Sequence, residues 1–198
     1  MEIPIFPLNG AILFPGTSLP LNIFEDRYIK MVDYALANNR LIGMIQRNEN
    51  NNLYKIGCIG KIQNFSETSD GRYIISLEGK KCFKLKDEIN SNHKFKLVKI
   101  VELENPKENI EDFNNKKKEF LINKYKKYLH FKKIDMDLKE IQSIDIFQIL
   151  KFIVMVSPFQ NIEKQMLLEV RENKIFYDKI ISILELEIFN LSDKMTIN

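Results

Sequence analysis

The chain has 198 residues, of which 44% are hydrophobic and 29% are charged, and its formal net charge is +3. This composition is typical of a globular protein with one large or two small domains. Two cysteines and two histidines are too few for a Cys/His zinc cluster or a disulfide scaffold. The N-terminus lacks the features of a signal peptide, and no apolar run is long enough to span a membrane. We therefore expect a soluble, cytoplasmic protein with reduced thiols.

Patterns typical of β-strands dominate the first 104 residues. Alternating or compact apolar segments predict strands over 3–9, 41–47, 53–67, 73–85 and 94–103. Asp70-Gly71 lies between two of these segments and predicts a hairpin, because glycine accepts the positive φ of a tight turn. Glycines within the strands predict bulges or bends of the kind that close a barrel: Gly57, Gly60 and Gly79.

Helical spacing interrupts the strands once and then dominates the second half of the chain. A first helix is predicted from Asp26 to about Asn38. After 105–109, the apolar period predicts helices over 111–129, 138–156, 161–170 and 174–191. We therefore predict an α+β protein with a β-rich domain over residues 1–104 and an α-helical bundle over 110–198.

No segment carries a catalytic or cofactor-binding signature. The segment 10-GAILFPGT-17 lacks the Gly-Lys-Ser/Thr ending of a phosphate loop, and no Gly-x-Ser-x-Gly elbow exists. A Ser-Lys dyad stays open, since both residues are common. Cys58 and Cys82 lie almost symmetrically about the Asp70-Gly71 turn, which makes them candidate cross-strand neighbours, and two unrelated reduced core thiols are favoured over a redox pair. We predict no catalytic residue, cofactor or metal ligand.

A lysine-rich segment is the main electrostatic feature. Eight lysines are opposed only by Glu119 across that segment: Lys116, Lys117, Lys118, Lys124, Lys126, Lys127, Lys132 and Lys133. Such a basic helix with interleaved aromatics could contact nucleic-acid phosphates or another anionic surface. The segment contains no arginine, the usual choice for bidentate phosphate contacts, and a solvated helix face is the favoured interpretation.

The segment 13-LFPGTSLPLNIFEDRY-28 combines chain breakers with large apolar residues. The order Phe14-Pro15-Gly16-Thr17 predicts a type II turn. A short strand follows, in which Pro20 requires an edge position or a bulge. The acids Glu25 and Asp26 begin the predicted helix, and Arg27 can pair with one of them. The segment is therefore predicted to be a corner formed by a turn, a strand and a helix.

This corner also resembles a known family. The order 4-PIFPLNGAILFPGTSLPLNIFEDRYIKMV-32 is similar to the opening of the N-terminal, substrate-binding domain of the ATP-dependent Lon protease. In that family Pro-Leu-Phe-Pro-Leu precedes Phe-Pro-Gly and then Leu-Pro-Leu-x-Ile-Phe-Glu-x-Arg-Tyr. The similarity continues more loosely in 56-IGCIGKI-62, 79-GKKCFKL-85 and 158-PFQNIEKQMLLEV-170. It thus covers nearly the whole chain, and its first thirty residues are the most specific.

The resemblance implies a PUA-like β-barrel followed by a helical bundle, and a role in contacting polypeptides. The chain ends at Asn198 without a Walker lysine motif. It therefore looks like a stand-alone member to which neither ATP hydrolysis nor proteolysis carries over.

Three functions remain open from the sequence. The leading hypothesis is a non-catalytic module that binds apolar polypeptide segments or a partner protein, with Phe14, Leu21, Phe24 and Arg27 as candidate residues. The alternative is nucleic-acid binding, with RNA as the ligand, in which Lys116, Lys117, Lys124 and Lys127 would form an anionic-ligand patch. The third hypothesis is a hydrolase, for which the sequence offers no candidate catalytic residue. The sequence does not give the ligand or the oligomeric state.

Overall fold

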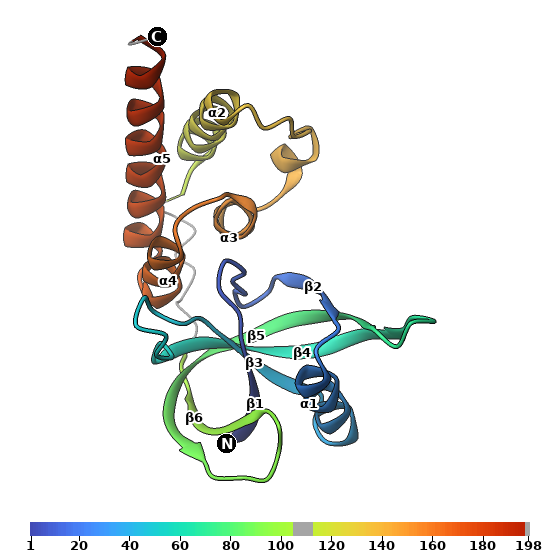
Figure 1. The fold of residues 1–198 in the computed structure, drawn as a ribbon. Coiled ribbons are helices and arrows are strands. Elements are labelled where there is room, and N and C mark those ends of the chain that lie inside the picture. The colour runs from blue at the N-terminus through green and yellow to red at the C-terminus, as the bar shows by residue number, and fades with distance from the viewer. Residues whose placement is uncertain (105–112, 197–198) are drawn as a thin grey trace. The chain divides into compact units, whose positions relative to one another are not determined.

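The computed structural model describes residues 1–104 and 113–196 (Figure 1). Contacts divide the chain into two compact units. The first contains Met1–Asn105 together with Pro158–Glu169, and the second contains Pro106–Ser157 together with Val170–Asn198. The strands belong to the first unit, and most of the helices belong to the second. The predicted α+β fold is therefore confirmed.

The strands of the first unit form a six-stranded sheet that closes on itself. They are β1 (Glu2–Pro7), β2 (Ser18–Ile23), β3 (Leu41–Ile45), β4 (Ile56–Glu67), β5 (Tyr73–Ile89) and β6 (Lys96–Glu102). Their order is β2-β5-β4-β3-β1-β6, and an additional pairing of β5 with β6 closes the last five into a barrel. All six predicted strand segments, including the one inside the corner, are thus confirmed, with ends shifted by a few residues.

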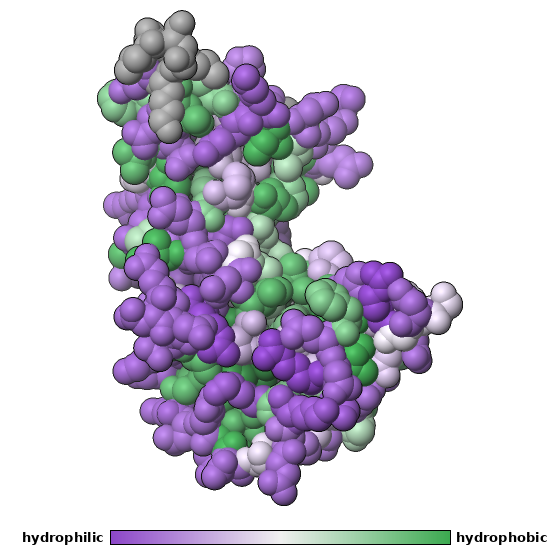
Figure 2. Space-filling model, in the orientation of Figure 1, coloured by the Kyte–Doolittle hydropathy of each residue, from purple (hydrophilic) through white to green (hydrophobic). Residues whose placement is uncertain are grey.

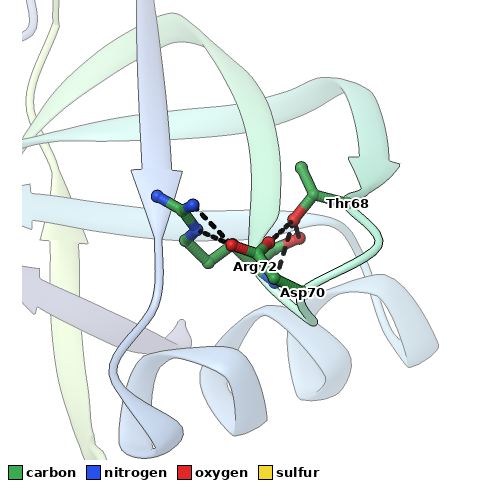
Figure 3. A network of polar contacts seen from close by, with 3 residues as sticks. All are labelled: Thr68, Asp70 and Arg72. Carbon is green, nitrogen blue, oxygen red and sulfur yellow. Dashed lines mark hydrogen bonds and ion pairs between the residues drawn. The ribbon is translucent and has the colours of Figure 1, made fainter.

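The hairpin between β4 and β5 extends beyond the barrel (Figure 1). A register shift follows Ile59, and β4 keeps its barrel partner β3 up to Lys61. We call the segment 60–79 the arm. At its tip Gly71 has a φ of 80°, as predicted for this turn. Thr68 and Arg72 bond the Asp70 carboxylate there (Figure 3), and the Arg72 guanidinium is the main cause of the lowered pKa of Asp70.

The predicted corner places β2 beside β5 of the arm and then continues into a helix. Gly16 has a φ of 76°, and the Thr17 N–H donates to the Phe14 carbonyl at 3.1 Å, which confirms the type II turn. Among the strands of the described residues, β2 pairs with β5 alone, so Pro20 stands on an edge strand as expected. Helix α1 (Asp26–Ala37) follows, and Arg27 forms an ion pair of 2.8 Å with Glu25.

Two apolar clusters stabilise the first unit. One combines residues of the five barrel strands alone, with Phe83 fully buried among isoleucines and Val98. The other joins strand residues to the buried face of α1, whose inward residues are Tyr28, Met31, Val32 and Ala35. Because alternate residues of one strand enter different clusters, both faces of the sheet are covered over much of its length.

The helices of the second unit are α2 (Asn115–Lys132), α3 (Ile146–Val156) and α5 (Asn173–Thr196). Asn114 accepts from the Lys117 N–H at 3.1 Å and so begins α2, whereas the predicted start at residue 111 lies outside the described residues. The prediction of one helix over 138–156 was wrong. A 3₁₀ turn, Glu140–Ser143, precedes α3, because the Asp145 carboxylate caps α3 by accepting from the Phe147 N–H at 2.8 Å.

Helix α4 (Asn161–Glu169) belongs to the first unit, although it follows α3 in the chain. The sequence predicted a division into residues 1–104 and 110–198. Contacts instead group α4 with the strands, because its buried polar side chains bond the backbone of the barrel unit. As a division into independently folding domains, the two ranges stay a prediction.

Candidate functional site

Exposed and half-buried apolar side chains occur on both faces of the strands where the arm meets β2. We call this set the arm patch: Leu21, Phe24, Phe65, Tyr73 and Ile74. In the register, Leu21 and Phe65 lie on either side of Ile75, and Asn22 lies opposite Ile74. The rings of Phe65 and Tyr73 meet edge to face, with centroids 4.9 Å apart. Strand pairing therefore brings Leu21, Phe65 and Tyr73, from three separate segments of the chain, to one face of the strands. Ile74 projects from the opposite face, because successive side chains of a strand alternate, and Phe24 follows β2 directly in the chain.

Polar groups fix and border the arm patch. The Tyr73 hydroxyl donates to the Asp33 carboxylate of α1 at 3.0 Å, which ties the arm to the helix. Partial burial, and then this bond, raise the pKa of Tyr73. The ion pair of Glu25 with Arg27 lies next to Phe24 in the chain. An apolar patch bordered by polar groups is typical of a protein-interaction surface.

The four predicted polypeptide-binding residues have different environments. Phe24 is 69% exposed, whereas Phe14 is only 5% exposed. Leu21 is half-buried against the cluster on α1. The exposed Arg27 guanidinium lies 4.5 Å from the centroid of the Tyr28 ring. The surface part of the prediction therefore rests on Leu21, Phe24 and Arg27, while Phe14 is a core residue.

Sequence reasoning missed the contribution of the arm. Phe65, Tyr73 and Ile74 were expected only as strand residues. Figure 2 shows one face of the molecule, on which hydrophobic residues in green reach the surface among hydrophilic ones in purple. A signal was present in the sequence, because Phe65 is a lone large apolar residue within the polar segment 63–72. A core strand position would be flanked by further apolar residues at alternate positions.

The predicted anionic-ligand patch is largely occupied by contacts within the second unit. The Lys124 ammonium lies 2.6 Å from a Glu185 carboxylate oxygen of α5, and Lys132 makes the same contact with Glu187. The Lys117 ammonium lies over the Phe113 ring, 4.9 Å from its centroid. Lys116 and Lys127 are exposed on α2. The sequence segment contained one acid, but the fold supplies two more from α5.

Buried polar side chains hold α4 in the first unit. The Lys164 ammonium, which is 4% exposed, donates to the Gly10 carbonyl at 2.9 Å. Gln165 donates to the Ile56 carbonyl at 3.0 Å and accepts from the Gln46 amide at 3.2 Å. These two side chains come from the Lys-Gln part of the family-like segment 158–170. That part therefore acts as a structural anchor.

The anchor gives a pH-dependent contribution to stability. Burial lowers the pKa of Lys164 below its ordinary value of 10.5. Between the lowered pKa and 10.5, the unfolded chain binds more protons than the folded one, so this group makes the folded state more stable as the pH rises. Relative to a Lys164→Met variant, the free energy of unfolding of the wild type is expected to increase through the alkaline range. Urea unfolding of both proteins from neutral pH to pH 10 tests this, and parallel pH profiles would contradict it.

No metal cluster and no membrane-spanning helix occur in the described part of the chain. Its His, Cys, Asp and Glu side chains form no group of three or more that could hold an ion. Its helices are too short or too polar to cross a bilayer. The arm patch is thus the candidate site that the described residues support best.

Comparisons with known structures identify the fold. The crystal structure of a Lon N-terminal domain protein from Xanthomonas campestris superposes with a TM-score of 0.64 at 15% identity, covering 93% of this chain and 98% of that one. The N-terminal domain of the Mycobacterium avium complex Lon protease gives a TM-score of 0.59 at 15% identity, covering 95% and 98%. Both likenesses extend over the strands and the helices together.

Sequence comparisons identify the family. The Lon protease of Flavobacterium johnsoniae is 33% identical over 122 residues, which are 57% of this chain and 15% of that protein. The Lon protease of Buchnera aphidicola subsp. Baizongia pistaciae is 26% identical over 202 residues, which are 95% and 25%. The chain thus spans a quarter or less of the length of these relatives. The family described as the ATP-dependent protease La (LON) substrate-binding domain matches residues 2–185, and the chain therefore belongs to this family.

Proposed function

We propose that this chain is a non-catalytic module that binds unfolded or apolar polypeptide segments through the arm patch. The observation that carries the proposal is Phe24, a large apolar side chain that is 69% exposed at a corner of defined structure. Ile23, directly before it, and Tyr28, four residues after it, are buried, so the core holds the chain on both sides of Phe24. Because this backbone is already ordered, the Phe24 ring can contact an apolar ligand with little further loss of backbone entropy.

Family membership supports the same proposal. The matching family is described as a substrate-binding domain, and its parent proteins are ATP-dependent proteases. The aromatic side chains of the arm patch are of the type that dominates binding energy at protein interfaces. Two exposed ion pairs, Arg27 with Glu25 and Arg72 with Asp70, adjoin Phe24 and Tyr73 in the chain and supply polar groups beside these aromatic side chains.

Replacing Phe24 with serine is expected to weaken polypeptide binding roughly tenfold or more, since truncation of a central aromatic residue commonly costs this much. The probe is reduced, carboxymethylated α-lactalbumin with a fluorescent label, and the readout is the change in its anisotropy. Phe189→Ser is the matched control, because Phe189 is 60% exposed on α5 in the second unit. Equal losses in both variants, or no loss in Phe24→Ser, would overturn the assignment of the site.

Nucleic-acid binding through the lysine-rich helix remains the alternative function. It predicts an RNA affinity that falls steeply as salt rises from about 50 to 200 mM. The ion pairs of Lys124 and Lys132 with acids of α5 reduce the charge that this face can offer. Fluorescence titration with a single-stranded RNA at two salt concentrations separates this function from polypeptide binding.

A further inference from the structure

The two cysteines of the chain face each other at the root of the arm. Cys58 of β4 lies directly opposite Cys82 of β5, which confirms that they are cross-strand neighbours. The register shift between Ile59 and Gly60 follows at once, so this pair belongs to the last regular part of the ladder before the arm. Both thiols are buried, and no disulfide joins them in this structure.

The hydrogen bonds around the pair define its geometry. The Leu85 N–H donates to the Lys55 carbonyl at 2.7 Å, so these two residues form a hydrogen-bonded pair of the β4–β5 ladder. Because such pairs alternate along an antiparallel ladder, Gly57 with Phe83 is also hydrogen-bonded, and Cys58 with Cys82 is not. The Cys82 carbonyl confirms this, since it accepts from the Leu103 N–H at 2.8 Å, on the side away from β4.

A non-hydrogen-bonded pair is the closer of the two kinds. Its Cα atoms are about 4.5 Å apart, and its side chains project from the same face of the sheet. The Cα separation of disulfides covers about 4.4–6.8 Å. The backbone at Cys58 and Cys82 can therefore accept a disulfide with little movement.

We propose that Cys58 and Cys82 form a reversible disulfide when the protein is exposed to hydrogen peroxide. One thiolate attacks a peroxide oxygen, the O–O bond breaks, and a sulfenic acid and hydroxide form. The second thiolate then attacks the sulfenic sulfur, forms the S–S bond and displaces a second hydroxide. The two thiol protons convert both hydroxides to water, so two thiols and one peroxide give one disulfide and two waters.

Burial of the two thiols favours disulfide formation over further oxidation of the first sulfur. Cys58 is fully buried and Cys82 is 3% exposed. Burial in apolar surroundings makes the first step slow, because it disfavours the thiolate. It also shields the sulfenic acid from a second peroxide, while the opposite thiol is a direct neighbour. The disulfide would enclose residues 59–81 in a covalent loop and hold β4 and β5 together at the root of the arm.

The test is oxidation of the purified protein with hydrogen peroxide, followed by denaturation, alkylation and non-reducing peptide mapping. We expect an intramolecular peptide pair linking Cys58 to Cys82 that dithiothreitol removes. In Cys58→Ser and Cys82→Ser, the remaining cysteine is instead expected to label with dimedone or to reach sulfinic acid. Sulfinic acids in the wild type at the yield of the variants, intermolecular dimers, or unreacted thiols would each overturn the proposal.

A stability measurement checks that the bridge forms in the folded protein. For a loop of this length, a disulfide without strain is expected to raise Tm by roughly 5–10 °C. Hydrogen exchange in the arm should slow in parallel, because its root can no longer open. An unchanged or lower Tm, together with unchanged exchange, would show that the bridge does not fit the native ladder. These readouts do not depend on polypeptide binding, so this proposal and the proposed function can fail separately.

Discussion

Replacing Gly79 with alanine is expected to lower the free energy of unfolding by roughly 3 kcal/mol or more, as overpacking against rigid atoms does. An ideal Cβ at this position would lie 2.0 Å from the Phe14 carbonyl oxygen. That oxygen belongs to the corner backbone, which Gly79 also holds through two hydrogen bonds of 2.8 Å, one to Thr17 and one from Gly16. The corner cannot move away without breaking these bonds. Urea unfolding followed by circular dichroism measures the loss.

Gly71 provides the matched control for Gly79. No atom lies within 4 Å of its ideal Cβ, so Gly71→Ala meets no steric contact. Its positive φ of 80° is the sole source of strain, and the expected loss is about 1 kcal/mol. Equal losses at the two positions would show that the contact between Gly79 and the corner does not determine stability.

Replacing Gln165 with alanine is expected to cost about 2–4 kcal/mol of unfolding free energy. The substitution leaves the Ile56 carbonyl without this donor and removes one of the two acceptors of the buried Gln46 amide, which also donates to the Asn161 carbonyl. Each buried polar group that loses its partner carries a desolvation penalty that water cannot easily relieve. The loss should be accompanied by faster hydrogen exchange within α4, because Gln165 ties this helix to the first unit.

Gln160→Ala is the control for this second substitution. Gln160 is the same residue type, directly precedes α4 and is exposed. A surface substitution of this kind is expected to change the free energy of unfolding by no more than about 0.5 kcal/mol. If both glutamine variants behaved alike, the network around Gln165 would not be the anchor of α4.

Local chemistry made most of the fold predictable. Asp70-Gly71 between alternating segments predicted the hairpin, and Pro15-Gly16 predicted the turn that leads into β2. These features depend on the φ preferences of a few neighbouring residues, so the sequence contains them directly. The placement of Pro20 on an edge strand follows in the same way from its missing N–H.

Long-range contacts were not predictable. Helix α4 has ordinary helical spacing, and nothing local assigns it to the first unit. Its assignment depends on Gln165 meeting Ile56, which is 109 residues away in the chain. The pairing of α2 with α5 is also long-range, since Lys124 and Glu185 are 61 residues apart in the chain. Periodicity gives the buried face of an element but does not name its partner.

The candidate site was predictable only in part. Phe14 and Phe24 look alike in sequence, since each adjoins a turn or a strand end. The fold separates them, because the backbone at Phe14 packs against Gly79, whereas Phe24 projects between Ile23 and the start of α1. The contribution of Phe65 and Tyr73 depends on the strand register that brings the arm beside β2. The exposure of these side chains thus depends on the folded structure and could not be predicted from local sequence.

Site-specific photo-crosslinking tests the central claim, that the arm patch binds polypeptide, most directly. A benzoyl-phenylalanine placed at position 24, and separately at position 189, is irradiated with reduced, carboxymethylated α-lactalbumin. Both positions hold exposed phenylalanines, so the probe replaces a similar ring in each unit. We expect covalent adducts from position 24 that unlabelled polypeptide competes away, and none above background from position 189. Adducts from position 189 alone, or equal adducts from both, would contradict the account.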